Sequence, residues 1–343
     1  MSTNISWASE SWNPVTGCSK ISEGCRNCYA AAMAPRLAAQ GIEGYTELPW
    51  TYPNAAANVH LHYDRLCRPL RWRRPRTAFV NSMSDLWHEQ VTDEFIDRVF
   101  AVMAVCPRHT FQILTKRPER MKAYLAQSTA HDEWAHRIEH LGFELLRERG
   151  VRDYPIVEAP LHNVWLGTSV EDQRAAEERV PHLLATPAAV RFLSCEPLLG
   201  PVDLRAISHT CAYSGAPMHF DALSANVDEG LYFEDHPHGH VASAGQPLCP
   251  RVDWVIAGGE SGAEYRAMDL DWARGLRDQA QSSGVAFFYK QSSGPRPGKD
   301  PTLDGHEWRQ FPAETTKGAG EPPPPAEHNG TTPRTPAMFD GEA

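Results

Sequence analysis

Short β-type runs alternate with helical stretches along most of the chain, and this alternation limits the possible fold more than any other feature of the sequence. The runs are rich in Val, Ile, Phe or Trp and are bounded by polar or glycine residues. They occupy residues 78–81, 110–114, 164–167, 190–194, 254–257 and 286–290, with helical signals between them, typically at 92–105 and 269–283. Strands that alternate with helices form a parallel sheet covered by helices, so we expect an α/β fold, namely a partial or complete (β/α) barrel.

Two segments interrupt this pattern. Residues 208–250 are loop-like and rich in histidine, which predicts an insertion, and its irregularly spaced His and Cys residues leave a metal site there as an open alternative. From residue 312 onward Pro, Gly, Glu and Thr dominate, which is typical of a disordered tail. We therefore expect one barrel domain at 1–311 and a disordered tail at 312–343.

Composition narrows the protein class. No run of eighteen apolar residues occurs, and the first residues lack the basic flank and apolar stretch of a signal peptide, so we expect a cytoplasmic protein that does not bind membranes. The formal net charge of -10 argues against a protein that coats DNA through a general surplus of positive charge. Eight cysteines in a cytoplasmic chain suggest metal ligation or catalysis before disulfides.

Three cysteines lie close together near the N-terminus with the spacing C-x6-C-x2-C, at Cys18, Cys25 and Cys28. Three thiolates can hold three irons of a 4Fe-4S cubane and leave the fourth iron open for another ligand. A structural zinc site is the main alternative. Zinc normally takes four protein ligands, and its fourth would have to come from a residue such as His60, His62 or Cys67. A trio without any metal is the remaining alternative.

Polar residues gather directly after the predicted strands, where the carboxyl ends of parallel strands converge on one rim. Lys116 and Arg117 follow one strand, and Cys195 and Glu196 end another. We expect Lys116, Cys195, Glu196 and, after a later strand, Glu260 to contribute to catalysis or substrate contact. For Lys116 and Arg117 a solvated surface pair is the alternative, and for Cys195 the alternatives are a fourth metal ligand, a hydrogen-atom donor or a small buried residue.

These motifs together resemble the radical SAM superfamily, and most closely a phage-associated three-cysteine family within it. The resemblance covers about residues 5–310 and rests on W-N-P-V-T-G-C-x6-C-x2-C-Y at 12–29, NSMSDL at 81–86, LTKRP at 114–118, SCEPL at 194–198 and GGESG at 258–262. It implies a barrel that binds a 4Fe-4S cluster and S-adenosylmethionine (SAM). The first cysteine gap is three residues longer than in the commonest superfamily motif, C-x3-C-x2-C, so the loop is expected to be longer.

The resemblance also implies residue roles. Tyr29 stands where superfamily members place an aromatic ring near the adenine of SAM, and Ser82, Ser84 and Asp85 stand where the SAM ammonium finds its acceptors. The region of Ser169 and Glu171 commonly holds the ribose and the methionine carboxylate. For this region the alternative is a helix cap, with Ser169 as the capping residue and Glu171 in the first turn.

The same resemblance implies the reaction. An external electron donor reduces the cluster, SAM is cleaved to a 5′-deoxyadenosyl radical, and this radical takes a hydrogen atom from the substrate. The phage association suggests a nucleobase or nucleotide as substrate, as in the hypermodification of DNA. Two alternatives from other classes stay open, a zinc-stabilised nucleic-acid-binding module and an iron-sulfur electron-transfer or sensor protein that does not cleave SAM.

One strongly basic stretch stands out in this acidic chain. It contains Trp72 and six arginines, Arg65, Arg68, Arg71, Arg73, Arg74 and Arg76. Such a stretch can bind phosphates, with the indole available for stacking. An ordinary solvated linker into the strand that begins near residue 78 is the alternative.

Overall fold

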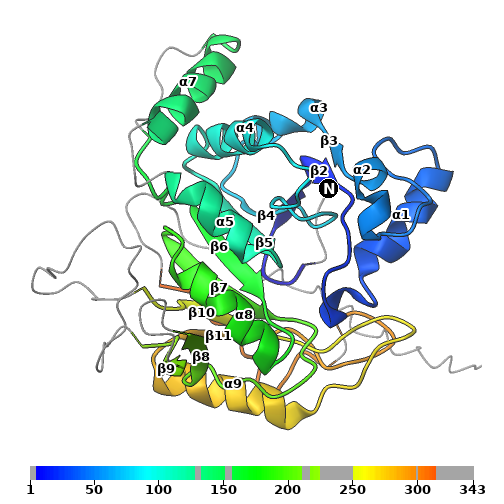
Figure 1. The fold of residues 1–343 in the computed structure, drawn as a ribbon, viewed down its shortest axis with the longest axis vertical. Coiled ribbons are helices and arrows are strands. Elements are labelled where there is room, and N and C mark those ends of the chain that lie inside the picture. The colour runs from blue at the N-terminus through cyan, green and yellow to red at the C-terminus, as the bar shows by residue number, and fades with distance from the viewer. Residues whose placement is uncertain are drawn as a thin grey trace, which may run out of the picture.

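Seven parallel strands form the main sheet of the protein (Figure 1). The computed structural model describes residues 5–127, 133–150, 157–210, 217–224, 250–298 and 300–313. The strand order is β1-β4-β5-β6-β7-β10-β11, and every neighbouring pair is parallel. The strands are β1 (Glu10–Trp12), β4 (Thr77–Val80), β5 (Thr110–Thr115), β6 (Val164–Ser169), β7 (Val190–Cys195), β10 (Trp254–Ala257) and β11 (Ala286–Tyr289).

The predicted α/β class is therefore confirmed, and the six predicted strands are all present. Strands β1 and β11 lie at the two edges of the sheet and no described strand joins them, which corresponds to a partial (β/α) barrel. Strand β1 was not predicted. A small antiparallel pair, β2 (Val15–Thr16) with β3 (His60–Leu61), lies beside the N-terminal strand.

Helices follow the strands and cover the outer face of the sheet (Figure 1). The described helices are α1 (Tyr29–Ala39), α2 (Ala55–Asn58), α3 (Tyr63–Leu66), α4 (Asp93–Ala104), α5 (Pro118–Leu125), α7 (Glu133–Arg147), α8 (Gln173–Leu184) and α9 (Leu270–Ser282). Of these, α7 packs on α4, and α1 packs beside Cys18 and Cys28. Single 3-10 turns occur at Glu23–Cys25, Tyr52–Asn54 and Pro69–Arg71. Among the described residues, none of these helices is long and apolar enough to span a membrane.

Local capping explains where two predicted helices begin. The Thr92 side chain accepts a hydrogen bond from the amide of Phe95 at the start of α4, and Asp269 caps α9 by accepting from the amide of Asp271. Both satisfy amides that have no partner within the helix. Gly284, with φ of +65°, follows the end of α9 and turns the chain into β11.

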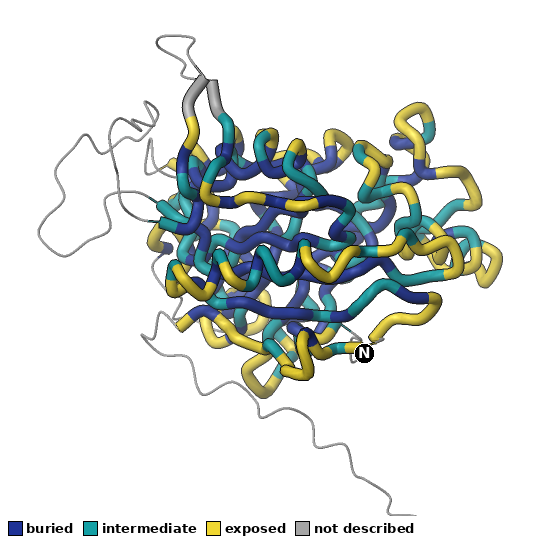
Figure 2. The backbone as a smooth tube through the Cα atoms, turned by 90° about the horizontal axis from the view of Figure 1, so that it is seen from below, coloured by how far each residue is buried: buried dark blue, intermediate teal, exposed yellow. Residues whose placement is uncertain are grey.

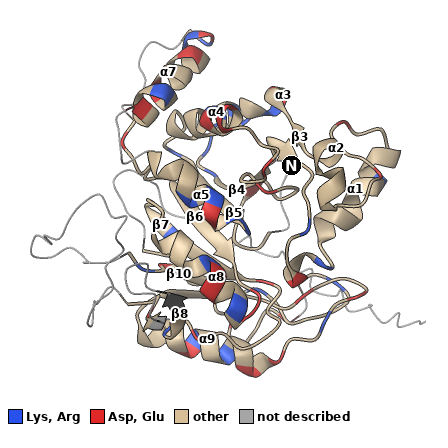
Figure 3. Ribbon diagram, viewed as in Figure 1, with Lys and Arg blue, Asp and Glu red and all other residues tan. Residues whose placement is uncertain are grey.

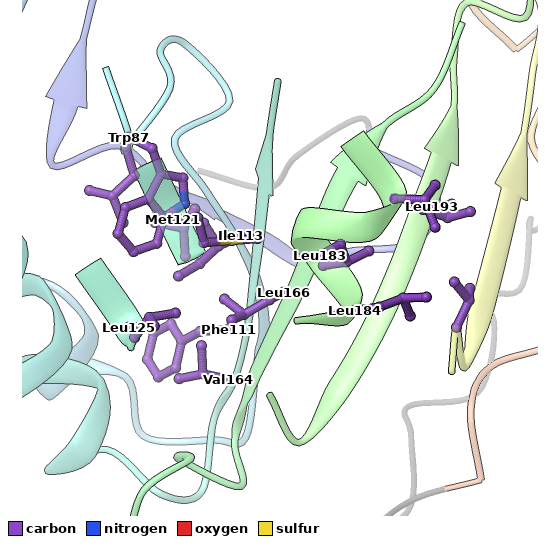
Figure 4. Close-up of a cluster of buried hydrophobic side chains, with 14 of the residues drawn as sticks. Trp87, Phe111, Ile113, Met121, Leu125, Val164, Leu166, Leu183, Leu184 and Leu193 are labelled. Atoms are coloured by element: carbon purple, nitrogen blue, oxygen red, sulfur yellow. The ribbon is translucent and has the colours of Figure 1, made fainter. Parts of the chain in front are cut away.

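The main hydrophobic core lies between the outer face of the sheet and the helices. Figure 4 shows side chains of β5, β6 and β7 meeting those of α5 and α8, and the tube in Figure 2 is buried along the strands. Alternate strand residues such as Phe111, Ile113 and Leu166 point to this side, while Met121 and Leu183 approach from the helices. The period of two along each strand thus sends one set of residues outward.

The other set fills the inside of the barrel with aromatic rings. Trp7, Phe79, Phe192 and Trp254 form a second cluster there, with the ring centroids of Trp7 and Phe79 4.8 Å apart. Gln112 is fully buried on the same side of β5, and neither its Nε2 nor its Oε1 has a hydrogen-bond partner among the described residues. These side chains close the barrel beneath the carboxyl ends of the strands.

The predicted insertion begins as a hairpin of β8 (Ile207–Thr210) with β9 (Pro217–Phe220). The remainder of the insertion that the sequence predicts, residues 211–216 and 225–249, lies outside the described residues, and so does the predicted tail from 314 onward. The candidate site is positioned by two parts of the domain. These are the residues before the insertion and residues 250–313.

Candidate functional site

A cavity of about 310 Å³ opens at the carboxyl ends of the strands, and we call it the rim cavity. Nearly all of the site residues predicted from the sequence line it, although they come from distant parts of the chain: Cys18, Cys25, Cys28, Tyr29, Ser82, Ser84, Asp85, Lys116, Ser169, Glu196 and Glu260. The predicted convergence on one rim is thus observed. The two predicted residues that do not line the cavity are Glu171 and Cys195.

The cysteine loop, residues 17–28, crosses one side of this cavity and begins at a glycine that cannot be replaced without strain. Gly17 has φ of +83°, and a Cβ there would lie 1.8 Å from the carbonyl oxygen of Asn58. Its amide donates to the carbonyl of Met83 at 2.9 Å, beside a parallel bridge to Ser84. The backbone therefore fixes the start of the cysteine loop against the segment that follows β4.

Glu171 holds the middle of the cysteine loop. Its carboxylate accepts from Ser22 at 2.8 Å and forms ion pairs with Lys116 at 3.3 Å and with Arg179 at 2.7 Å. Gly24 approaches it so closely that a Cβ would lie 2.1 Å from Oε1. Burial alone would raise the pKa of Glu171, but Lys116 and Arg179 hold it below the ordinary value, so the carboxylate stays charged.

A second acidic residue, Glu260, holds the end of the cysteine loop. It forms an ion pair with Arg266 at 2.6 Å and accepts from the amide side chain of Asn27 at 3.1 Å. Arg266 also donates to the carbonyl of Glu23 at 3.0 Å. The pKa of Glu260 would be raised by burial but is held down by Arg266, which leaves a charged carboxylate beside the cavity.

The first cysteine lies in a charged, buried surrounding. Nη1 of Arg117 donates to Sγ of Cys18 at 3.6 Å and pairs with Asp85 at 3.3 Å, while Nη2 donates to Oγ of Ser19 at 2.9 Å. Burial raises the pKa of the Cys18 thiol to about 12, with Asp85 adding to the rise and Arg117 opposing it. Arg117 is itself buried, and its pKa stays raised because Asp85 and Cys18 outweigh its desolvation.

Cys25 and Cys28 line the same cavity, and Cys25 influences the charge state of both other thiols. Burial raises the pKa of Cys28, and the backbone amides of Ala31 and Ala30 oppose this more than Lys116 does. Within the described residues, no three side chains of Cys, His, Asp or Glu come together as a donor set for one metal ion. The three thiols thus line the cavity at separate positions.

The residues expected to contact the SAM ammonium are already hydrogen-bonded within the protein. Asp85 accepts from the Thr115 hydroxyl at 2.8 Å and from Arg117, and Ser84 donates to the carbonyl of Val15 at 2.8 Å. The Tyr29 hydroxyl donates to the carbonyl of Ser82, and 53% of Tyr29 is exposed. These contacts place the predicted oxygens on the cavity wall and fix their orientation.

A pair of opposite charges that the sequence prediction identified only in part lies across the cavity. Glu196 forms an ion pair with Lys290 at 2.9 Å and accepts from Ser194 at 3.2 Å. Lys290 directly follows β11. In the prediction from sequence it is the last residue of the strand 286–290 and is not assigned to the site. A Cβ on Gly258 would lie 2.7 Å from Oε1 of Glu196, so the glycine leaves room for this carboxylate.

The remaining predicted residues lie elsewhere or act differently. Cys195 is fully buried in the outer core, because neighbouring strand residues point to opposite faces and Glu196 takes the inner side. The alternative role of Ser169 as a helix cap is wrong. Ser169 ends β6 and lines the cavity, and Asp172 caps α8 by accepting from the amide of Ala175. Burial raises the pKa of Cys195.

The residues considered as a fourth zinc ligand do not line the rim cavity. His62 is buried, and its Nε2 lies 2.8 Å from the hydroxyl of Thr16. His60 packs beside it, and Cys67 influences the pKa of Cys106 on another side of the core. Of the described residues, the only thiols that line the cavity are the three of the cysteine loop.

Comparison with known proteins gives the family. A search of curated proteins and a search of solved structures each found no match to the chain. A family model described as "Protein of unknown function (DUF5131)" matches residues 2–312, which include every residue that lines the rim cavity and the whole described sheet. The chain therefore belongs to the DUF5131 family.

Proposed function

We propose that this protein is a radical SAM enzyme in which Cys18, Cys25 and Cys28 hold a 4Fe-4S cluster and the rim cavity binds SAM. The observation that carries the proposal is the position of the three thiols. They line the same cavity as the polar residues that follow β4, β5, β6, β7 and β10. On this proposal the cluster and the polar pocket at the carboxyl ends of the partial barrel would form one site.

The donor set fits a cubane better than a single ion. In a cubane each thiolate binds a different iron, so the sulfurs need separate positions around a shared space. The cysteine loop offers three thiols along one cavity, and no imidazole of the described residues lines it. Three ligands leave one iron open, and this open iron is where SAM would bind. The loop is held in place from both sides through Glu171 and Glu260.

The cavity also fits a cofactor of this size and charge. Its volume of about 310 Å³ falls in the range of roughly 300–1,000 Å³ that is usual for small-molecule sites. Lys116 and Lys290, each paired with a glutamate, line the cavity together with the hydroxyls of Ser169 and Ser194. Trp7 and Phe79 form an apolar floor that excludes water from the reacting groups.

Cys18, Cys25 and Cys28 would hold the cluster, and when bound it would supply the one-electron reduction of SAM that leads to hydrogen abstraction from the substrate. The protein's own residues position the reactants. Arg117 donates to Cys18, and the Glu196–Lys290 pair lines the same cavity. This pair offers one acceptor and one donor, which suits the edge of a nucleobase, and we propose a nucleobase or nucleotide as the substrate class.

Anaerobic reconstitution with iron and sulfide tests the proposal. We expect about four irons per chain, and after addition of a one-electron reductant and SAM we expect 5′-deoxyadenosine. Cys25→Ala should lose the cluster and keep the circular dichroism spectrum, because Cys25 lies on a loop outside the core. Cys67→Ala is the matched control, since Cys67 does not line the cavity and its loss should leave the iron content unchanged.

The outcomes separate the proposal from the other two classes. Zinc in place of iron, or an unchanged iron content in Cys25→Ala, would contradict the cluster. Four irons without 5′-deoxyadenosine, in the presence of reductant and candidate nucleotides, would favour an electron-transfer or sensor protein instead.

A further inference from the structure

Four exposed arginines lie within six residues of one another along the chain, at the end of the sheet opposite the rim cavity. They are Arg71, Arg73, Arg74 and Arg76, and we call them the arginine strip. The carbonyl of Arg76 accepts from the amide of Thr110 at the start of β5, so the strip lies at the amino ends of β4 and β5. The cavity residue Asn81 follows five positions later, and five strand residues span roughly 16 Å.

The strip is held in a fixed position by the residues beneath it. The ring of Trp72 lies 5.2 Å from that of His109 and 6.5 Å from that of Phe111, so the indole packs on the core. It is therefore not the free stacking group expected from the sequence. Arg108 donates to the carbonyl of Trp72 at 2.6 Å, and the amide of Arg76 donates to His109 at 3.2 Å. The guanidinium groups thus project from an ordered loop.

The arginines of the strip have no acidic partner within the described part of the chain. The two earlier arginines of the basic stretch are used internally, because Arg68 pairs with Glu10 at 3.3 Å and Arg65 donates to the carbonyl of Glu43. On the helices the charges are mixed instead, and Figure 3 shows acidic and basic residues side by side along α7, α8 and α9. A protein with a net charge of -10 therefore carries, within its described residues, a group of neighbouring arginines without acidic partners.

We infer that the arginine strip binds the sugar-phosphate backbone of a nucleic acid. The strip contains arginine and no lysine, and the guanidinium fork binds phosphate oxygens in a bidentate manner. An anionic membrane would also attract the charge, but firm membrane binding uses apolar side chains beside the basic ones. Trp72 is turned inward, and none of the large exposed apolar residues of the described chain belongs to this loop.

The inference does not depend on the proposed radical chemistry, because the strip and the cavity lie at opposite ends of the strands. It assigns the protein a contact with nucleic acid that depends on charge and not on base sequence. The contacts to phosphate position a protein on nucleic acid without specifying sequence.

Binding of the full chain to a fluorescent DNA duplex of about 20 base pairs, measured by anisotropy at several salt concentrations, tests the inference. The variant replaces all four strip arginines by glutamine. The matched control replaces four exposed arginines elsewhere, Arg36, Arg174, Arg296 and Arg309, and so changes the net charge equally. Two double variants, Arg71→Gln with Arg73→Gln and Arg74→Gln with Arg76→Gln, serve if the fourfold variant does not fold.

We expect the fourfold variant to bind at least about tenfold more weakly at low salt and to lower the slope of log affinity against log salt by about 3.6, since each of the four phosphate contacts contributes about 0.9. Each double variant should show about half of this change in slope. The control should bind like the natural chain. Equal losses in strip and control variants, or no binding by the natural chain, would overturn the inference. Binding to phosphatidylserine vesicles without binding to DNA would overturn it in favour of a membrane partner.

Discussion

His109 makes the stability of the arginine strip and the adjoining sheet depend on pH. The ring is 1% exposed, and its Nδ1 accepts the hydrogen bond from the amide of Arg76. Burial lowers the pKa of His109 from 6.5 to about 4, and the nearby charge of Arg108 adds to this effect. A proton on Nδ1 would remove the acceptor that fixes the start of β4. The folded state therefore binds this proton more weakly than the unfolded state does.

The size and direction of the effect follow from these values. The pKa of His109 is lower in the folded state than in the unfolded state, so above pH 6.5 this residue does not reduce the free energy of unfolding. The free energy of unfolding then decreases as the pH falls from 6.5 towards about 4. Each pKa unit corresponds to about 1.4 kcal/mol, which gives a loss of about 3 kcal/mol from this one residue. His62, whose pKa is also lowered to about 4 by burial, adds a second loss over the same range.

Urea denaturation at pH 7, 6, 5 and 4.5 would measure this for the natural chain and for His109→Asn. The asparagine Oδ1 can accept from the Arg76 amide but does not titrate, and contributions from His62 cancel in the comparison. We expect His109→Asn to be less stable at pH 7, because the ring contacts are lost. Between pH 7 and pH 4.5, its free energy of unfolding should decrease by about 2 kcal/mol less than that of the natural chain. Parallel pH profiles for the two proteins would refute the reasoning.

Three further results are expected. Arg117→Lys should lower the midpoint potential of the proposed cluster by on the order of 50 mV, because the variant loses the hydrogen bond to Cys18. An electron paramagnetic resonance titration would measure the potential, and an unchanged value would argue against this role of Arg117. Gly24→Ala should lower the free energy of unfolding by about 1–3 kcal/mol, because its Cβ meets the fixed carboxylate of Glu171. Gln112→Leu should stabilise the protein by about 1 kcal/mol in urea titration, since it removes a buried amide without partners; a clear loss of stability would contradict this.

The strands and the position of the site were predictable because both depend on local patterns. The apolar runs at β5 and β6 are bounded by clear polar signals, and the carboxyl ends of parallel strands must converge. Strand β1 was missed because Glu10-Ser11-Trp12 is short and carries a charge, and it becomes a strand through pairing with β4. Its buried Trp12 was the one available signal.

The roles of individual rim residues were less predictable. Side chains alternate between the two faces along β7. Ser194 and Glu196 therefore line the cavity, while Cys195 between them is buried in the outer core. Ion pairs between distant loops depend on the complete fold. Nothing near Glu171 in the sequence indicates that Lys116 and Ser22 would both bind it. The partner of Glu196, Lys290, is likewise set by the neighbouring positions of β7 and β11 on either side of β10.

The contacts of the cysteine loop also fix an order of events during synthesis. The loop leaves the ribosome early, yet the residues that hold its middle and its end, Glu171 and Arg266, are made much later. A nascent chain that has not reached residue 266 cannot hold the three thiols in their final positions. Assembly of the proposed cluster on these thiols is therefore expected only after the chain has been made and folded beyond residue 266.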